Sequence, residues 1–214
     1  MPNLFTEDTY EQAIIELFEN MGYDHLYAPD FDRDYTSPIL DSILRDSLVR
    51  INRGLPVEAI DEAMSKLKNF DTGSLLQKNM IFMDYLQNGV TIKFFVKGEE
   101  QSSIVRLIDY QNVKSNSFYV VNQLTFLENG NNRRPDIILF INGLPLVLME
   151  LKSPAKDEVG VENAYHQIRN YMQDIPSIFY YNAICVISDL STNKAGTITS
   201  GLDRFMEWKT KDGN

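Results

Sequence analysis

The sequence predicts a single α/β domain in which a mixed sheet is flanked by helices and preceded by a helical elaboration. Helical spacing of apolar residues dominates the first part of the chain, to about residue 87. From Val90 the apolar period switches toward two, which is typical of strands, and nearly continuous apolar runs follow, as in strands covered on both faces. This order of elements favours one domain over 1–214, with the helical elaboration at about 31–87 and the core at about 90–208.

Four segments in the first part of the chain carry the helical spacing. The second of them opens on Ser37-Pro38, which predicts a serine N-cap followed by a first-turn proline. Gly22 and Gly54 follow the last apolar residues of two segments, as helix stops do. The expected helices cover about 6–21, 37–54, 56–70 and 75–86.

Strands are expected in the second part of the chain. Asn142-Gly143 joins two apolar, β-branched runs, and this dipeptide is the strongest short-range hairpin signal. The polar stretch 128–134 predicts a loop, and 161–173 has the spacing of a helix that ends before Pro176. The expected strands cover about 90–96, 104–108, 118–127, 137–141, 146–151 and 183–188.

Composition and charge limit the class of protein. The chain has 30 acidic and 20 basic residues, a formal charge of −10 and a sequence pI of about 4.7, so its average field repels nucleic acid and anionic membranes. A metal site for phosphodiesters nevertheless needs local carboxylates, so the acidic balance does not exclude an enzyme of nucleic acids. Cys185 is the only cysteine, which excludes an intramolecular disulfide and the usual cysteine-based zinc site.

The sequence gives no sign of a membrane partner. No apolar run approaches the roughly 20 residues of a membrane span. The N-terminal segment carries Glu7, Asp8, Glu11, Glu16 and Glu19, which excludes a secretory signal. We therefore expect a cytoplasmic protein.

Three ionisable residues stand at the ends of the apolar hairpin. Asp136 lies at the entry of its first strand, and Glu150 and Lys152 lie near the end of its second. Because side chains alternate along a strand, Glu150 and Lys152 share a face, and the hairpin returns Asp136 beside them. Two carboxylates and an ammonium at one place suit Mg²⁺-dependent hydrolysis of a phosphodiester. The spacing also fits a structural arrangement, in which Asp136 caps a turn and Glu150 and Lys152 offset each other's burial.

The residues around this hairpin carry a resemblance to a known family. Pro135-Asp136, thirteen intervening residues and Glu150-Leu151-Lys152 follow the nuclease motif of the R subunits of type I restriction enzymes, and the intervening Asn142-Gly143-Leu144-Pro145 is characteristic of those subunits. Gln167 and Tyr171 similarly fit the family's Gln-x-x-x-Tyr signature. The resemblance implies a restriction-endonuclease-like fold of the PD-(D/E)xK superfamily, with the catalytic core in the second part of the chain.

The resemblance implies a role for each residue of the hairpin cluster. Asp136 and Glu150 would hold Mg²⁺, with the main-chain carbonyl of Leu151 as a further oxygen ligand. Lys152 would position or activate the attacking water. Glu11 takes the place of the acidic residue on the family's first helix and could approach the metal, unless it only compensates the helix dipole.

The resemblance also implies residues that contact DNA. Gln167 and Tyr171 are four residues apart on one helical face and would hold DNA or couple cleavage to a motor. Alternatively, Gln167 caps a backbone group and Tyr171 packs in the core. Independently of the resemblance, Arg133 and Arg134, and Lys152 with Lys156, could contact phosphates at the rim, unless the polar loop is simply solvated.

The expected function follows from the same resemblance. The chain would be the Mg²⁺-dependent endonuclease part of an R subunit, and it would cut double-stranded DNA that helicase-like motor domains translocate. The sequence has no Gly-x-x-x-x-Gly-Lys-Ser/Thr phosphate loop, so ATP would serve only motor domains outside this chain, which we expect to be a fragment. The implied protein partners are a modification (methyltransferase) subunit and a specificity subunit. Two other functions remain open: a non-catalytic DNA-docking or assembly module, and a stand-alone PD-(D/E)xK nuclease.

Overall fold

The computed structural model describes residues 6–28, 33–71, 73–152 and 160–207. Its helices are α1 Glu7–Asn20, α2 Asp41–Ile51, α3 Val57–Lys68, α4 Leu75–Asn88, α5 Val161–Asp174 and α6 Pro176–Tyr180, with the 3₁₀ helices η2 Val113–Ser115 and η3 Leu202–Arg204. Its strands are β1 Asp24–Tyr27, β2 Val90–Val96, β3 Glu99–Val105, β4 Phe118–Asn122, β5 Phe126–Glu128, β6 Asn131–Arg133, β7 Ile137–Ile141, β8 Leu144–Leu151, β9 Ile184–Ser188, β10 Asn193–Gly196 and β11 Met206–Glu207.

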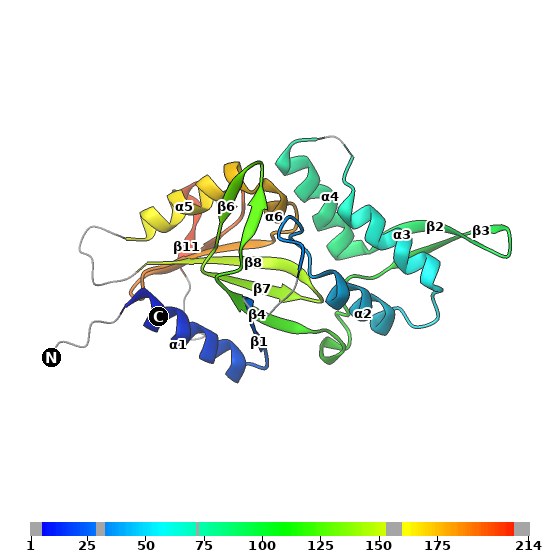
Figure 1. Cartoon of the computed structure of the whole chain (residues 1–214), viewed down its shortest axis with the longest axis horizontal. Helices are drawn as coiled ribbons and strands as arrows, with labels where there is room; N and C mark the ends of the chain where they lie inside the picture. The colour runs from blue at the N-terminus through cyan, green and yellow to red at the C-terminus, as the bar shows by residue number, and fades with distance from the viewer. Residues whose placement is uncertain (1–5, 29–32, 72, 153–159, 208–214) are drawn as a thin grey trace.

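Seven of the described strands form one mixed sheet in the order β1-β4-β7-β8-β9-β10-β11. Strand β1 is parallel to β4 and β8 is parallel to β9, whereas the other neighbours are antiparallel. Helix α1 lies over one face of this sheet and α5 over the other (Figure 1). The predicted mixed sheet with flanking helices is therefore confirmed. In the part of the chain that the structure describes, no helix is long and apolar enough to cross a membrane.

The two central strands are buried on both faces, which explains their nearly continuous apolar sequence. Ile138 and Phe140 of β7 pack in the core cluster beneath α5, whereas Ile137 and Leu139 pack in the cluster beneath α1. This alternation is the ordinary consequence of strand geometry. Each such aliphatic side chain stabilises the fold by roughly 1.5–3 kcal/mol when it is fully buried. Together they make the β7–β8 pair a rigid base for the residues at its ends.

The β7–β8 turn connects the sheet to the helical elaboration. Asn142 and Gly143 have φ angles of 53° and 81°, the left-handed conformation that the predicted Asn-Gly hairpin requires. A Cβ atom on Gly143 would lie 2.7 Å from the carbonyl oxygen of Leu40 and 2.8 Å from the amide nitrogen of Leu44. The Leu40 amide also donates to the Gly143 carbonyl at 3.0 Å. The turn is therefore wedged against the start of α2, where only glycine fits.

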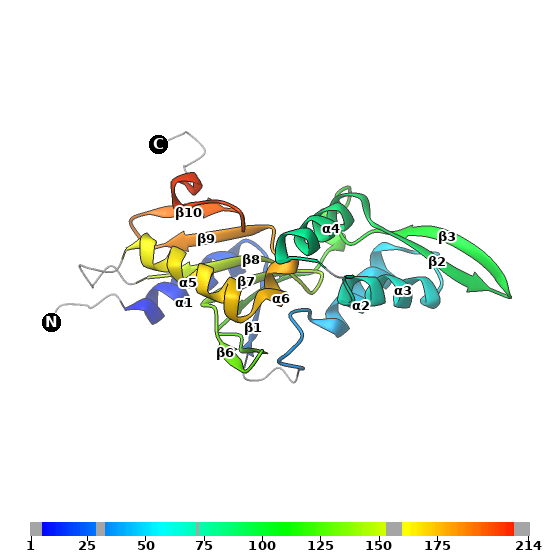
Figure 2. The same cartoon turned by 90° about the horizontal axis from the view of Figure 1, so that it is seen from above.

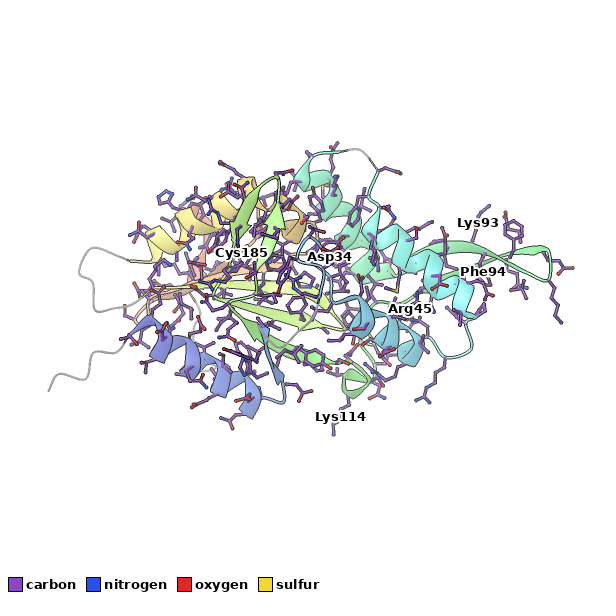
Figure 3. The ribbon with its side chains drawn as sticks, viewed as in Figure 1. Asp34, Arg45, Lys93, Phe94, Lys114 and Cys185 are labelled. Carbon is purple, nitrogen blue, oxygen red and sulfur yellow. The ribbon has the colours of Figure 1, made fainter. Side chains whose placement is uncertain are left out.

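Helices α2, α3 and α4 build a second core with the β2–β3 hairpin at one end of the sheet (Figures 1 and 2). Strands β2 and β3 pair only with each other among the described strands, and the hairpin projects from the body of the molecule (Figure 2). Val90, Ile92 and Phe94 are its buried face and pack on the helical core. Figure 3 labels Lys93 and Phe94 on this projection, away from Cys185 in the main body. The alternation predicted over 90–96 is correct, but the strand predicted over 104–108 is wrong in its bounds, since β3 ends at Val105, and the hairpin lies outside the central sheet.

The predicted start of the second helix was wrong. Helix α2 begins at Asp41, and Ser37 precedes it in a bend in which its hydroxyl accepts from the Ile39 amide at 3.3 Å. The helix begins later because the bond between Leu40 and Gly143 holds the chain against the sheet at that point. A tertiary contact has displaced a local capping signal.

Two further expectations around residues 118–134 need correction. The predicted strand 118–127 is divided into β4 and β5 because Gln123 has a φ angle of 52°, which turns the chain between them. The predicted loop 128–134 is largely the β5–β6 hairpin, which turns at Asn129-Gly130. Its strands are polar and short, so period-two alternation could not reveal them.

Candidate active site

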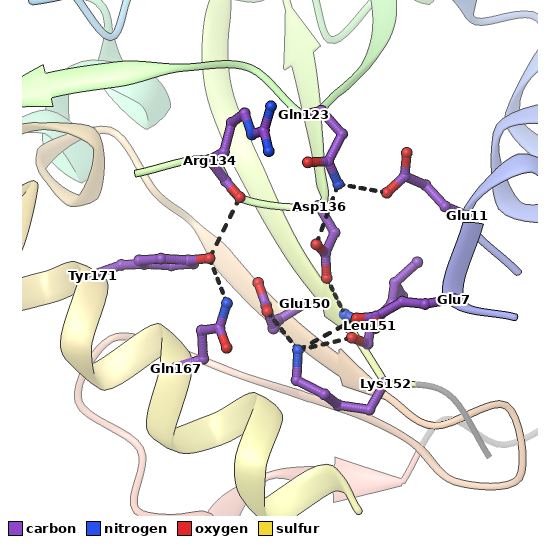
Figure 4. A network of polar contacts seen from close by, with 10 residues as sticks. All are labelled: Glu7, Glu11, Gln123, Arg134, Asp136, Glu150, Leu151, Lys152, Gln167 and Tyr171. Carbon is purple, nitrogen blue, oxygen red and sulfur yellow. Dashed lines mark hydrogen bonds and ion pairs between the residues drawn. The ribbon is translucent and has the colours of Figure 1, made fainter. Parts of the chain in front are cut away.

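Asp136, Glu150 and Lys152 meet at one end of the β7–β8 pair (Figure 4). The register pairs Ile137 with Met149, which brings the residue before β7 beside the end of β8. Glu150 is fully buried, and Asp136 is 8% exposed. The structure thus brings together the two carboxylates and the lysine that the sequence singled out.

The Lys152 ammonium holds the end of β8 together. Its Nζ donates to Glu150 Oε1 at 2.8 Å and to the main-chain oxygen of Leu151 at 3.0 Å. It also forms an ion pair with Glu7 of α1 at 3.5 Å. The ammonium therefore lies between two of the oxygens expected to bind a metal. Glu7 is a contact that the sequence analysis did not identify.

The carboxylates of Asp136 and Glu150 are poorly compensated. Burial raises the pKa of Asp136 to about 6, although its Oδ2 accepts from the Leu151 amide at 2.8 Å. Burial and the neighbouring charge of Asp136 raise the pKa of Glu150 to about 8. Burial lowers the pKa of Lys152, but the attraction of Glu150, Asp136 and Glu7 outweighs it and raises that pKa overall, so the lysine stays charged. The Lys152 ammonium thus compensates the charge of two buried carboxyl groups.

Glu150 Oε2 is a buried oxygen with no hydrogen-bond partner in the described structure. A buried polar atom without a partner costs free energy, so an unpaired carboxylate oxygen beside a second acid marks a place suited to a cation. Two carboxylates and a carbonyl are hard oxygen donors, which Mg²⁺ prefers, and Mg²⁺ commonly keeps several waters. Among the described residues, no group of three or more acidic, histidine or cysteine side chains forms a complete cation site. The chemistry of these oxygen donors therefore fits Mg²⁺.

Glu11 belongs to an amide network on the α1 side of the site. Its Oε1 accepts from Asn122 Nδ2 at 2.6 Å, and its Oε2 accepts from Gln123 Nε2 at 2.7 Å. Gln123 Nε2 also lies 3.4 Å from Asp136 Oδ1, and its backbone amide donates to the Asp136 carbonyl at 2.9 Å. His25 Nε2 is 2.9 Å from Asn122 Oδ1. Through these contacts Glu11 is linked to Asp136 by Gln123.

Gln123 is a site residue that the sequence analysis missed. Its left-handed backbone conformation is uncommon for a residue other than glycine, and such residues are concentrated at functional sites. The available signal was the adjacent amide pair Asn122-Gln123 at the end of an apolar strand. That signal is weak, because amides at strand ends are also ordinary turn residues.

Gln167 and Tyr171 face the carboxylates from α5, on the other side of the site (Figure 4). Gln167 Nε2 donates to the Tyr171 hydroxyl at 2.7 Å, and this hydroxyl donates to the main-chain oxygen of Arg134 at 3.4 Å. Burial and the charge of Glu150 raise the pKa of Tyr171. The Arg134 side chain is exposed, and Figure 4 shows its guanidinium directed away from Glu150. Lys156, a further expected phosphate contact, lies outside the described residues.

The fold and the site together define the class of protein. A mixed sheet with helices on both faces carries an acid before one strand, and an acid and a lysine at the end of the adjacent strand. This is the arrangement that the resemblance to the PD-(D/E)xK nuclease superfamily led us to expect.

The chain belongs to the family described as the type I restriction enzyme R protein N terminus, whose model matches residues 4–204. It is 32% identical over 98% of its length to the type I restriction enzyme HindI endonuclease subunit of Haemophilus influenzae, of which it covers 21%. It is 33% identical over 93% of its length to the putative type I restriction enzyme MjaIXP endonuclease subunit of Methanocaldococcus jannaschii, of which it covers 20%. The chain thus spans about a fifth of the length of these curated relatives.

Proposed function

We propose that this chain is the Mg²⁺-dependent endonuclease part of a type I restriction enzyme R subunit and that it hydrolyses phosphodiester bonds of double-stranded DNA. The observation that carries the proposal is the unpaired, fully buried Glu150 Oε2 beside Asp136 and Lys152 at the end of the β7–β8 pair. If Glu150 only supported the fold, we would expect both of its carboxylate oxygens to be hydrogen-bonded, because a buried oxygen without a partner costs free energy.

The side chains divide the chemistry among them. Asp136, Glu150 and the main-chain carbonyl of Leu151 would hold the ion. When bound, Mg²⁺ would supply Lewis-acid stabilisation of the phosphate and a water of lowered pKa. Lys152 carries the positive charge that orients the attacking water and offsets the charge developing on the phosphate. Gln123 keeps the Asp136 carboxylate in place through its amide, and Gln167 and Tyr171 line the opposite side.

Coupling to a motor and to partner subunits is the second part of the proposal. The relatives are named type I restriction enzyme endonuclease subunits, and this chain spans about a fifth of their length. We assign ATP-driven translocation to helicase-like domains in the remainder of such a subunit. A modification (methyltransferase) subunit and a specificity subunit would complete the enzyme and select the DNA sequence.

A divalent-metal titration of the 214-residue chain tests the proposal. Mg²⁺ or Mn²⁺ should raise the unfolding temperature of the wild type, because a ligand at a hundredfold its Kd adds about 2.7 kcal/mol of stability. Glu150→Gln should abolish this response, whereas Glu58→Gln, an exposed glutamate of α3, should retain it. Equal responses of wild type and Glu150→Gln would contradict the proposed site.

DNA cleavage separates the two competing functions. A stand-alone nuclease would cut plasmid DNA as this chain alone, with Mg²⁺ and without ATP. A docking or assembly module would leave cleavage intact in an assembled complex that carries Asp136→Ala or Lys152→Ala. We expect cleavage only in the assembled complex, with ATP, and its loss in both variants.

A further inference from the structure

A polar groove opens beside the candidate active site, between α5 and the β5–β6 hairpin. Its volume is about 670 Å³. Gln167 and Tyr171 form its border with the carboxylate cluster, since both also face Glu150 (Figure 4). The lining residues carry hydroxyl, amide or guanidinium groups and are Thr125, Asn132, Arg133, Arg134, Gln167, Asn170 and Tyr171.

The hairpin wall of this groove is fixed to the helical wall. Arg133 Nε forms an ion pair with Asp174 Oδ2 at 2.7 Å, and Asn131 Nδ2 donates to the Asp174 carbonyl at 3.2 Å. The Ser177 amide donates to Glu128 Oε2 at 3.0 Å, which ties β5 to the start of α6. Because both strands of the hairpin are held, the groove is a preformed surface.

The charge of the groove differs from that of the chain as a whole. The chain has a formal charge of −10, yet the lining residues include two arginines and no acidic residue. Among the described residues, no carboxylate pairs with Arg134. Arg33 adds positive charge behind the wall, where its guanidinium donates to the Thr125 carbonyl and lies 4.6 Å from the Phe126 ring centre. The groove is therefore a local site for an anion on an acidic protein.

We propose that this groove binds the sugar–phosphate backbone of a DNA strand next to the phosphate that is cut. The proposal rests on the proposed function and extends it to Arg133, Asn132, Asn170 and Thr125, on a surface outside the carboxylate cluster. Guanidinium, amide and hydroxyl groups are the usual partners of phosphate oxygens, and such contacts fix position without reading sequence. This matches a nuclease whose sequence choice is made by another subunit. Arg134 supplies a positive charge with which no described carboxylate pairs, and Arg133 can exchange Asp174 for a phosphate.

DNA binding by charge-removal variants tests the groove. The 214-residue chain would be titrated into a fluorescent DNA duplex in EDTA, which prevents cleavage, at about 50 mM salt. Arg134→Ala should weaken binding roughly five- to tenfold and reduce the slope of log affinity against log salt by about 0.9. Arg133→Ala should act in the same direction, with a smaller effect because Asp174 already neutralises part of its charge. Arg53→Ala, an exposed arginine near α2, is the matched control and should leave binding unchanged.

Cross-linking locates the DNA independently of affinity. Cys185 is fully buried and is the only cysteine, so one introduced thiol can be addressed selectively. Asn132→Cys in the groove should cross-link to DNA that carries a thiol-reactive group on its backbone, and exposed Asn88→Cys at the end of α4 should not. Inorganic phosphate or ATP at equal concentration should not compete with the duplex, whereas effective competition would indicate a small-anion site.

The outcomes separate this inference from the proposed function. Unchanged DNA affinity in Arg134→Ala, equal cross-linking at Asn132 and Asn88, or no binding by the wild type at low salt would each overturn the groove assignment. The metal response of wild type and Glu150→Gln does not depend on the groove. A normal metal response with unaltered DNA binding would therefore reject the groove and leave the metal site standing.

Discussion

The helical core and the end of the central sheet differ in how fully their buried polar groups are hydrogen-bonded. In the helical core, Asn79 donates to three main-chain oxygens at 2.8–3.2 Å, and Asn52 bonds both to Leu48 and to the main chain of Arg106. At the end of the sheet, Glu150 retains an oxygen without a hydrogen-bond partner. The two other such buried atoms among the described residues are Arg33 Nε and Asp41 Oδ1, and Asp41 Oδ1 forms an ion pair with Lys68 at 2.7 Å. A buried polar group that only supports a fold is satisfied, because each unmade bond costs stability. Glu150 differs from the other cases because it is fully buried beside a second acid, and this combination is why we assign a function to the sheet site.

The largest expected effect concerns the sheet site. Asp136→Ala or Lys152→Ala should lower DNA cleavage at least 100-fold in an assembled type I complex that contains this chain, because charge stabilisation at the phosphate is lost. The variants should remain folded, which circular dichroism would show. A cleavage rate within a few-fold of wild type in either variant would contradict a functional role for the sheet site.

Next in size is a truncation in the helical core. Leu48 is fully buried, so Leu48→Ala should lower the free energy of unfolding by roughly 2–5 kcal/mol. Urea denaturation measures the loss. The metal-dependent stabilisation that remains should equal that of wild type, and a lost metal response in the folded variant would show that the cores are coupled.

A pH dependence distinguishes the buried acid from the buried amides. The pKa of Glu150 is about 8 in the folded protein against an ordinary value of 4.5, so the native state holds the proton more tightly. Stability in EDTA should therefore be complete below pH 4.5 and fall as the pH rises toward 8, by on the order of 2–4 kcal/mol from this group. Glu150→Gln should remove this part of the slope. The prediction would be refuted if the free energy of unfolding changed equally with pH, from pH 5 to 8, in wild type and variant.

A smaller effect is expected at Gln123. Gln123→Leu removes the amide that joins Glu11 and Asp136, so the affinity for Mn²⁺ should fall roughly tenfold, as for other groups that orient metal ligands. Calorimetric titration measures the affinity. Gln123→Glu keeps the size of the side chain but replaces the donating amide with a carboxylate, so it should not retain the wild-type affinity for Mn²⁺. Wild-type affinity in Gln123→Leu would show that the amide network is only structural.

The smallest effect lies on the surface of the helical region. Arg45 and Asp61 form an ion pair between α2 and α3, with side chains 45% and 50% exposed. Arg45→Ala should cost less than about 1 kcal/mol, because solvent and salt screen exposed pairs. A loss above that level in a thermal or urea melt would mean that these helices depend on the pair.

Local patterns predicted those parts of the molecule that local forces determine. The Asn142-Gly143 turn, the two buried strands and the helices at 57–68 and 75–88 follow from turn chemistry and apolar period. The turn also returns the acid before β7 to the end of β8 that carries the second acid and the lysine, but the register shift between Leu139 and Phe140 sets the final pairing, and no local pattern predicted that shift.

Other features depended on contacts between distant segments. The polar strand β1 forms by pairing with β4, and the β5–β6 hairpin is held by Asp174 of α5, although neither has a clear apolar pattern. The N-cap signal at Ser37 was overruled by the contact of Leu40 with Gly143. Local propensity is worth too little free energy to resist such contacts.

The sequence by itself determined the class of fold, the hairpin and the identity of its three charged residues, because these depend on spacing along a few neighbouring residues. Only the tertiary structure decided that Glu150 Oε2 is unpaired, that Gln123 links Glu11 to Asp136, and that a basic groove lies beside them. Burial and hydrogen bonding are properties of packed surroundings, which come from residues far apart in the chain. A local sequence pattern cannot specify burial or hydrogen bonding.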